Sequence, residues 1–293
     1  MTEQDTTRTI HEFDRAGLNL WCDEERFEVT RERLAEYAAA TNDPIDAHRS
    51  GDVASPVFAI VPVFDALMSP AVDVVPMEIF GRITHGEQDF HFHRPIRPGD
   101  ELVSKGRVIG WESKSTGALV YIHLTCHDDV TGELVNEQYL SGFFRGVDAG
   151  PKVGEAIPEI SPNTDAKQGE PIAEVSAHVD DDQTFRYAPA SGDPVPIHLD
   201  EDVAKEAGLP GIIAHGLCTM AMAGWGVLSQ VADSDVSRVK RFAVRFSKFV
   251  FPGDDLSTRI WKVGTTDGVT TYAFETIRDG DVVLSNGVAE IAD

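Results

Sequence analysis

The 293-residue chain is 42% hydrophobic and carries 25 basic against 49 acidic residues, a formal net charge of −24 at pH 7. This composition supports a folded core and excludes a disordered protein, while the charge argues against nucleic-acid binding. We see neither an apolar run of about 18 residues nor a secretion signal, and three widely spaced cysteines suit a reducing compartment. We therefore expect an acidic cytoplasmic protein with no membrane span.

The first half of the chain predicts helices followed by strands. Residues 30–40 and the apolar stretch 58–67 have helical patterns, and four later runs have the composition of strands. The strand-like runs are 90–94, 101–111, 119–127 and 134–144.

The second half repeats this order. Helices are predicted at 183–190 and 217–231. Strands are predicted at 241–249, 256–263, 270–277 and 282–291.

Two motifs recur in the same order in both halves. Asp43 and His48 stand five positions apart, as do Asp193 and His198, and a Pro-Gly-Asp turn sequence follows each pair about fifty residues later. The offsets between the copies are 150 and 154 residues, which indicates a duplication. We therefore predict an α+β protein with two homologous domains.

The expected domain boundaries follow from composition. We assign 1–147 to an N-terminal domain with a degenerate motif and 173–293 to a C-terminal catalytic domain. Residues 148–172 are the linker, because Gly, Pro, Lys and acidic residues dominate there and the hydrophobic periodicity lapses.

The most informative segment surrounds the second Asp/His pair. Ser-Gly-Asp with two nearby prolines predicts a loop after a helix, which can place Asp193 and His198 on one wall of a cleft. A carboxylate and an imidazole together can hold, deprotonate and reprotonate a water molecule. Further along, Gly216 opens a helical stretch, so its N–H is suited to stabilise a carbonyl oxygen that becomes enolate-like.

At these residues the sequence resembles the MaoC-like, hydratase-2 family of enoyl-CoA hydratases and dehydratases, and in particular the hydratase domain of peroxisomal multifunctional enzymes type 2. The resemblance covers most of 173–293. It implies a double hot-dog fold, two tandem domains each with a long helix wrapped by an antiparallel sheet. It also implies reversible hydration of trans-2-enoyl-CoA to (3R)-3-hydroxyacyl-CoA, with Asp193, His198 and Gly216 as catalytic residues and no metal or redox cofactor.

One position departs from the family pattern. The family motif usually has Asn two residues after the catalytic Asp, and this chain has Val195 there. Because a Val side chain donates no hydrogen bond, this substitution bears on the rate, the substrate or the activity itself.

Other residues are candidates for binding substrate. Tyr187, His215 and Leu217 flank the predicted site, and a basic stretch with no glycine-rich phosphate loop offers charges for a CoA phosphate. The basic candidates are Arg241, Arg245 and Lys248. His85, His91, His93 and His123 have strand spacing for a metal site, but no set of ligands completes one, so none is predicted.

Two alternatives remain open at this stage. The first is an acyl-CoA thioesterase on the same fold, in which the Asp directs water at the carbonyl carbon. The second is a non-catalytic subunit that binds an acyl thioester, motivated by Val195 and the degenerate first half. An acyl-CoA is the expected small-molecule partner in each case, and a homodimer is possible because hot-dog chains assemble further.

Overall fold

The computed structural model describes residues 9–160, 167 and 169–293, so part of the predicted linker lies outside the described residues. Helical elements of the first half are η1 (Arg15–Gly17), α1 (Arg31–Ala40), α2 (Asp46–Arg49), η2 (Pro56–Val63), α3 (Phe64–Val74) and η3 (Met77–Arg82). Those of the second half are α4 (Gln183–Ser191), η5 (Pro196–His198), α5 (Glu201–Glu206), α6 (Gly216–Val231) and η6 (Val236–Arg238).

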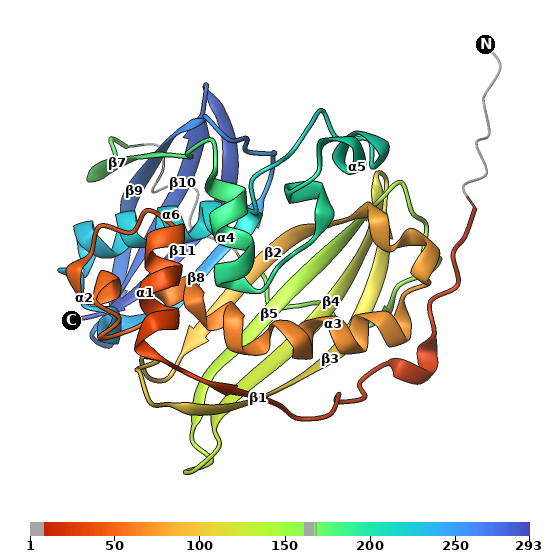
Figure 1. The fold of residues 1–293 in the computed structure, drawn as a ribbon, viewed down its shortest axis with the longest axis horizontal. Coiled ribbons are helices and arrows are strands. Elements are labelled where there is room, and N and C mark those ends of the chain that lie inside the picture. The colour runs from red at the N-terminus through yellow and green to blue at the C-terminus, as the bar shows by residue number, and fades with distance from the viewer. Residues whose placement is uncertain (1–8, 161–166, 168) are drawn as a thin grey trace.

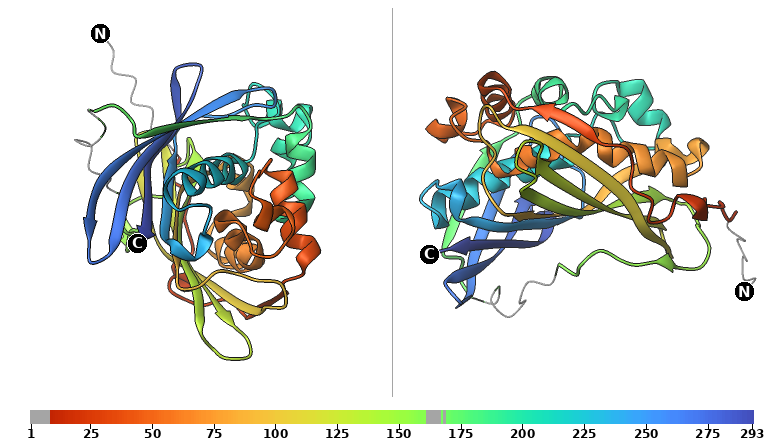
Figure 2. Two further views of the ribbon diagram at one scale, coloured as in Figure 1. Left: turned by 90° about the vertical axis from the view of Figure 1, so that its left-hand side faces the viewer. Right: turned by 90° about the horizontal axis from the view of Figure 1, so that it is seen from below.

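The strands pair into one antiparallel sheet with the helices on one side (Figures 1 and 2). The first-half strands are β1 (Glu25–Glu28), β2 (Ile83–Phe92), β3 (Glu101–Lys114), β4 (Gly117–Asp128), β5 (Leu134–Arg145) and the short β6 (Val153–Gly154). The second-half strands are β7 (Ala173–His178), β8 (Val239–Phe246), β9 (Asp255–Thr266), β10 (Val269–Arg278) and β11 (Asp281–Ala292). The order β1-β3-β4-β5-β2-β8-β11-β10-β9-β7 fuses the two halves through β2 and β8.

All eight predicted strands are confirmed, with small differences at their ends. The largest difference is in β2, which begins at Ile83 rather than at residue 90. Three of the described strands were not predicted. They are β1 and β7, each of which pairs with only one neighbour at an edge of the sheet, and the short β6, which pairs with β3. Both Pro-Gly-Asp sequences form the predicted turns, with Gly99 at φ 92° and Gly253 at φ 88°, a conformation that favours glycine.

The central helix of the second half is confirmed, whereas that of the first half is interrupted. The predicted helix at 58–67 is a 3-10 stretch, η2, followed by α3, and each contains a proline. Because Pro62 has no N–H, the carbonyl of Ala59 lacks its usual donor, and Gln138 Nε2 supplies one at 2.7 Å. Cys22 Sγ lies 3.8 Å from the carbonyl of Ala66, four residues before Pro70.

Segment Pro56–Val74 has the length and composition of a membrane span, which the sequence analysis did not find, yet 61% of it is buried inside the fold. Its buried residues, among them Val57, Phe58 and Ala66, belong to the main hydrophobic core. We therefore interpret it as a core element of this fold.

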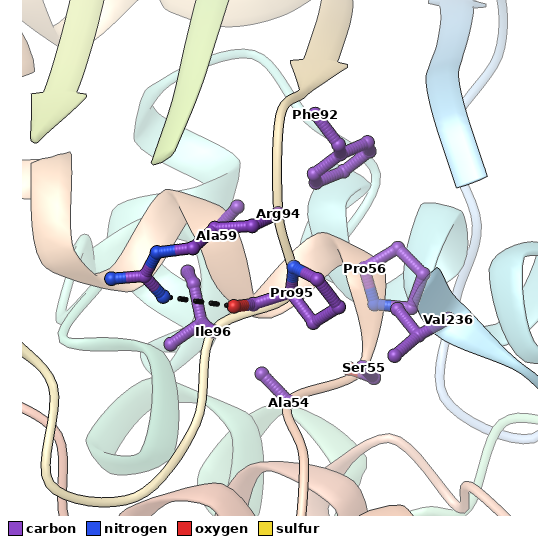
Figure 3. A pocket seen from close by; sticks show the side chains of 9 residues that line it. All are labelled: Ala54, Ser55, Pro56, Ala59, Phe92, Arg94, Pro95, Ile96 and Val236. Carbon is purple, nitrogen blue, oxygen red and sulfur yellow. Dashed lines mark hydrogen bonds between the residues drawn. The ribbon is translucent and has the colours of Figure 1, made fainter. Parts of the chain in front are cut away.

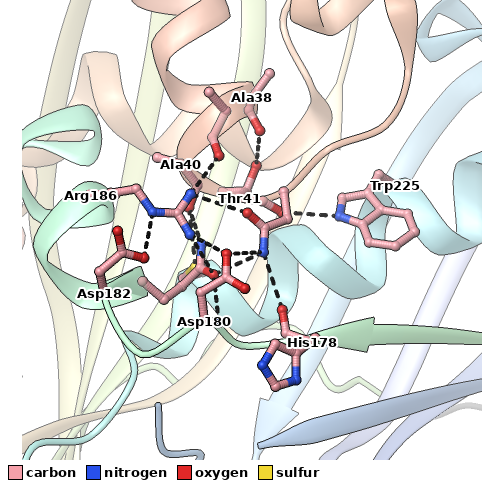
Figure 4. Close-up of polar contacts among 12 residues, drawn as sticks. Ala38, Ala40, Thr41, His178, Asp180, Asp182, Arg186 and Trp225 are labelled. Carbon is pink, nitrogen blue, oxygen red and sulfur yellow. Dashed lines mark hydrogen bonds and ion pairs between the residues drawn. The ribbon is translucent and has the colours of Figure 1, made fainter. Parts of the chain in front are cut away.

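The two halves also interlock where α1 meets α4 (Figure 4). The last carbonyls of α1 have no intrahelical donors, and side chains from the second half supply them. Arg186 donates to Ala39 O at 3.1 Å, Gln183 to Ala40 O at 2.5 Å, and Trp225 Nε1 to Thr41 O at 3.2 Å. Docking of the second half thus completes the C-terminus of a first-half helix.

On the outer face of the sheet, a buried ion pair crosses the β2–β8 boundary. Arg241 on β8 donates through Nε and Nη2 to both carboxylate oxygens of Asp89 on β2, at 2.9 and 2.7 Å. The Asp89 side chain is fully buried. Burial alone would raise the pKa of Asp89, but hydrogen bonds from His91 and Arg241 outweigh it, and the pKa is lowered.

Removing one partner of this pair is expected to destabilise the fold. We predict that Arg241→Met lowers the free energy of unfolding by about 3 kcal/mol at pH 7, since it leaves a buried carboxylate unpaired. Arg245→Met, at an exposed position of the same strand, is the matched control. Urea unfolding measures both. The difference should narrow as the pH falls, because protonation removes the carboxylate charge that Arg241→Met leaves unpaired. Equal stability of the two variants at pH 7 would contradict the role assigned to the pair.

Candidate active site

Asp193 sits in the loop that follows α4. Gly192 ends the helix in the left-handed conformation at φ 80°, which turns the chain sharply. The Asp193 N–H then donates to Ser191 Oγ at 3.2 Å, and Asp193 Oδ1 accepts the N–H of Val195 at 3.2 Å. The carboxylate is thus held by a backbone donor, and Oδ2 has no protein hydrogen bond among the described residues.

Val195, the position where the family pattern has Asn, packs against a small apolar cluster of Ile197, Leu209 and Ile213. Its side chain therefore stabilises the loop, and its backbone N–H contacts the carboxylate. A donor to Asp193 is retained at this position without a side-chain amide.

His198 ends the 3-10 turn η5 and is buried. Its Nδ1 lies 2.8 Å from the carbonyl of Ile213. Because a carbonyl only accepts hydrogen bonds, Nδ1 carries the proton and the neutral ring offers Nε2 as a base. No described protein group contacts Nε2 by a hydrogen bond, so it is available for a water molecule.

His215 completes the cluster. It precedes α6, donates from Nε2 to the carbonyl of Asp193 at 3.2 Å, and stacks on His198 with ring centroids 3.8 Å apart and an interplanar angle of 25°. Tyr187 packs on its ring at 4.9 Å. The side-chain ligand atoms of Asp193, His198 and His215 lie within 4.8 Å of one another.

Burial sets the charge of this cluster. It raises the pKa of Asp193, an effect that the nearby His198 partly offsets. It lowers the pKa of His198 despite the Ile213 carbonyl and Asp193, and it lowers the pKa of His215 to about 3, helped by His198. Both imidazoles are therefore neutral near pH 7, beside a partly buried carboxylate. By proximity alone the three groups are also suited to hold a metal ion; the expectation of no metal stays a prediction.

Gly216 is the first residue of α6, and no side chain caps that helix. The N–H groups of a first helical turn lack intrahelical partners, so this end presents donors beside the cluster. Phe246 explains the glycine: a Cβ at this position would lie 3.1 Å from its ring. The predicted site residues Asp193, His198 and Gly216 are thus arranged at one end of α6, although their catalytic roles remain a prediction.

The corresponding Asp and His of the first half form a closed pair, bonded directly to each other. His48 Nδ1 binds Asp43 Oδ2 directly at 2.7 Å, and both side chains are buried. The same backbone hydrogen bond occurs in both halves, from Ala54 N to Ile96 O and from Ala214 N to Val250 O. The two alanines are therefore equivalent. It follows that Ser55 corresponds to His215 and Pro56 to Gly216.

Proline has no N–H to donate, so this position offers no equivalent of the Gly216 donor. The cavity here has a volume of about 10 Å³, no larger than one water molecule needs (Figure 3). It is lined by Ala54, Ser55, Pro56, Ala59, Phe92, Arg94, Pro95, Ile96 and Val236. This geometry argues against a second active site.

A difference in loop length accounts for the different pairing of the two histidines. Six positions separate His48 from Ala54, and sixteen separate His198 from Ala214. The longer segment contains α5 and supplies the Ile213 carbonyl that binds His198 Nδ1. The same nitrogen of His48 binds its Asp instead.

The predicted substrate-binding residues are only partly gathered at this site. Tyr187, His215 and Leu217 are buried at or next to the cluster. Arg241 is engaged by Asp89 and Glu290, which explains it structurally without a ligand.

Of the two remaining basic candidates, Arg245 lies near the end of β8 and Lys248 lies just beyond it. Arg245 is exposed, and Lys248 pairs with Asp281 at 2.5 Å. The repeat aligns Lys248 with Arg94, a lining residue of the small first-half cavity. A substrate-binding role for Arg245 or Lys248 stays a prediction.

Histidines outside the cluster belong to other environments. His123 stacks on Tyr139 at 4.6 Å and contacts Glu137 on the outer face of the sheet, and His91 contacts Asp89. Among the described residues, the only group of three potential ligands found close together is the one at Asp193. A larger hollow of about 280 Å³, lined by residues such as Lys105, His127 and Asp129, contains no residue of this cluster.

The chain is similar to known proteins along most of its length. Residues 163–280 match the family model of the MaoC like domain, and 16–138 match that of a FAS1-like dehydratase domain region. A probable enoyl-CoA hydratase 2 of Dictyostelium discoideum is 33% identical over 75% of this chain and 76% of its own. The peroxisomal multifunctional enzyme type 2 of Mus musculus is 30% identical over 80% of this chain, which spans 31% of that longer protein.

A solved MaoC-like dehydratase from Phytophthora capsici superposes with a TM-score of 0.79 at 25% identity, covering 94% of this chain and 96% of that one. These matches confirm the predicted double hot-dog fold. With the names of its relatives, this fold makes the protein a hydro-lyase of the hot-dog class. The chain belongs to the MaoC-like family of enoyl-CoA hydratases and dehydratases.

The two Asp/His pairs are expected to respond in opposite ways to the same substitution. Since burial raises the pKa of Asp193, its charged form is costly at pH 7, and Asp193→Asn should raise the free energy of unfolding by about 1 kcal/mol. Asp43→Asn should lower it by about 2 kcal/mol because it weakens a buried hydrogen-bonded pair. Urea unfolding at pH 7 measures both. If Asp193→Asn lowers the free energy of unfolding and Asp43→Asn leaves it unchanged, the assigned effects of burial and pairing are wrong.

Proposed function

We propose that this protein reversibly hydrates a trans-2-enoyl-CoA to a (3R)-3-hydroxyacyl-CoA. The observation that carries the proposal is the open Asp193/His198 pair beside the uncapped N-terminus of α6. One water can contact both the Asp193 carboxylate and His198 Nε2, while the N–H of Gly216 faces the same end of the site. The family membership and the names of the relatives support this reaction. The (3R) configuration is what the resemblance to the hydratase-2 family implies.

The reaction needs one proton removed and one returned. The pair takes a proton from water as the oxygen bonds to C3, and the double-bond electrons move toward the thioester oxygen, where the N–H of Gly216 and the helix dipole stabilise the charge. A proton from the pair then bonds to C2. Burial lowers the pKa of His198, so its neutral ring is in a suitable state to take the first proton. The balance requires no redox cofactor or metal.

The substrate and the setting are part of the proposal. The acyl-CoA is the small-molecule partner, and an apolar path between the halves would hold its acyl chain. The cytoplasm fits the three free cysteines, two of them buried, although several relatives are named peroxisomal. A homodimer stays a prediction.

The proposal is tested by the loss of the enoyl absorbance near 263 nm with crotonyl-CoA and a longer enoyl-CoA, together with chiral analysis of the product. Asp193→Asn and His198→Ala should each lose at least about 100-fold in kcat because they remove the acid/base pair. Asp43→Asn, assayed where circular dichroism shows it folded, should stay within about threefold of wild type.

Three outcomes of that assay would contradict the proposal. Release of free thiol would indicate a thioesterase, and tight binding without turnover would indicate a binding subunit. A loss of kcat in Asp43→Asn equal to that in Asp193→Asn would show that the active site is not at Asp193 alone.

As the pH falls, kcat/KM should decline only below about pH 6.5, the ordinary pKa of a histidine side chain. The reason is that activity requires neutral His198 and burial lowers its pKa, so the enzyme retains its base in mildly acidic solution. A pH–rate profile with saturating and limiting substrate measures this. A decline that begins above about pH 7 would show that a different group, or a charged His198, controls the reaction.

A further inference from the structure

Two tyrosines, one from each half, meet at the boundary between the repeats. Tyr37 on α1 and Tyr187 on α4 occupy equivalent positions, 150 residues apart, and their hydroxyl oxygens lie 3.3 Å from each other. Both side chains are fully buried, and their rings pack at 5.6 Å. A buried hydroxyl pair at the junction of an open and a closed site calls for a functional explanation.

The hydrogen bonds of this pair can be counted. Two hydroxyls carry two protons, and their mutual bond uses one. The structure shows no other hydrogen bond from either hydroxyl among the described residues. The second proton therefore belongs to whichever tyrosine accepts from the other.

Groups near Tyr37 offer this proton no suitable acceptor. Asp43, its charged neighbour, has Oδ1 bound to the N–H of Ile45 and Oδ2 bound to His48 Nδ1, and neither oxygen is within hydrogen-bond distance of the Tyr37 hydroxyl. Cys218, the other titratable neighbour, directs its Sγ to the carbonyl of Ala40. Either hydroxyl could donate in their mutual hydrogen bond, and donation from Tyr37 to Tyr187 would satisfy the Tyr37 proton.

The groups around Tyr187 differ from those around Tyr37. His215 packs on its ring at 4.9 Å, and the Nδ1 of His215 is buried with no hydrogen-bond partner. Asp193 is also its neighbour, and Oδ2 of that carboxylate has free acceptor capacity. When Tyr37 donates, the remaining proton of the pair is carried by Tyr187 beside the catalytic cluster.

We propose that Tyr37 is a positioning residue for the active site of the other half: it donates to Tyr187 and so directs the Tyr187 hydroxyl proton toward the reacting thioester and its water. This inference rests on the proposed hydratase function. The closed first half then contributes to the chemistry of the second through one hydrogen bond, in addition to shaping the fold.

The packing around α1 supports a fixed geometry. Phe58 contacts the Tyr37 ring edge-on at 5.3 Å, and the contacts from Arg186, Gln183 and Trp225 hold the end of the same helix. Burial raises the pKa of both tyrosines, so each stays a proton donor throughout the working pH range.

Four proteins test the proposal: wild type, Tyr37→Phe, Tyr187→Phe and the double variant, with enoyl-CoA hydration as the assay. Tyr37→Phe should lower kcat about 10-fold with KM within about twofold, because a misdirected donor weakens transition-state rather than ground-state contacts. The loss should be constant between about pH 6 and 9, since no group that titrates is removed. The double variant should be no slower than Tyr187→Phe alone, because Tyr37 acts only through Tyr187.

Tyr121→Phe is the matched control, since its hydroxyl binds Glu112 on the outer face of the sheet. Thermal unfolding of all variants separates lost stability from lost positioning. The inference is overturned when Tyr37→Phe behaves like Tyr121→Phe, or when the losses of the two single variants multiply in the double variant. An inactive wild type would instead refute the proposed function, so the two failures are distinguishable.

Discussion

The antiparallel pairing of β2 with β8 is the constraint on which the rest of the structure depends. It turns two sheets into one, and the register sets Phe90 opposite Phe242 in the core and His91 opposite Arg241 on the outer face. With the sheets fused, the helices of both halves share one side, so α1 lies against α4 and α6 against η2 (Figure 1). A site built at the start of α6 is consequently within reach of side chains from the first half.

The two repeats share this architecture but differ in one loop length and in the residue at one helix start. A segment ten positions longer gives His198 a carbonyl to bind, which leaves its other nitrogen without a protein partner near the Asp193 carboxylate. The shorter loop lets His48 collapse onto Asp43, and a proline removes the donor at the helix start. Asp193 and His198 are buried without a direct hydrogen bond to each other, so their burial lowers the stability of the fold. Such a cost is expected for residues that serve catalysis rather than stability.

Much of this was predictable from the sequence, because the duplication and the strand periodicity are local signals. The Asp/His spacing and the helix starting at Gly216 are likewise local. The break in the first central helix depends on Pro62 and Pro70, which a helical hydrophobic pattern conceals. Arg241 was interpreted as a phosphate ligand because the sequence does not reveal its partner Asp89, 152 positions away. The Tyr37–Tyr187 contact is equally non-local, although the repeat offset of 150 would have pointed to it.

The proposed reaction requires that one repeat hold an activated water against a thioester while the other is closed. A crystal structure of Asp193→Asn with a bound 3-hydroxyacyl-CoA would show whether this is so. We expect a single acyl group, with its thioester oxygen at the N–H of Gly216 and its C3 hydroxyl between residue 193 and His198. An acyl group bound at Asp43 and His48, or a carbonyl carbon rather than C3 facing the pair, would contradict it.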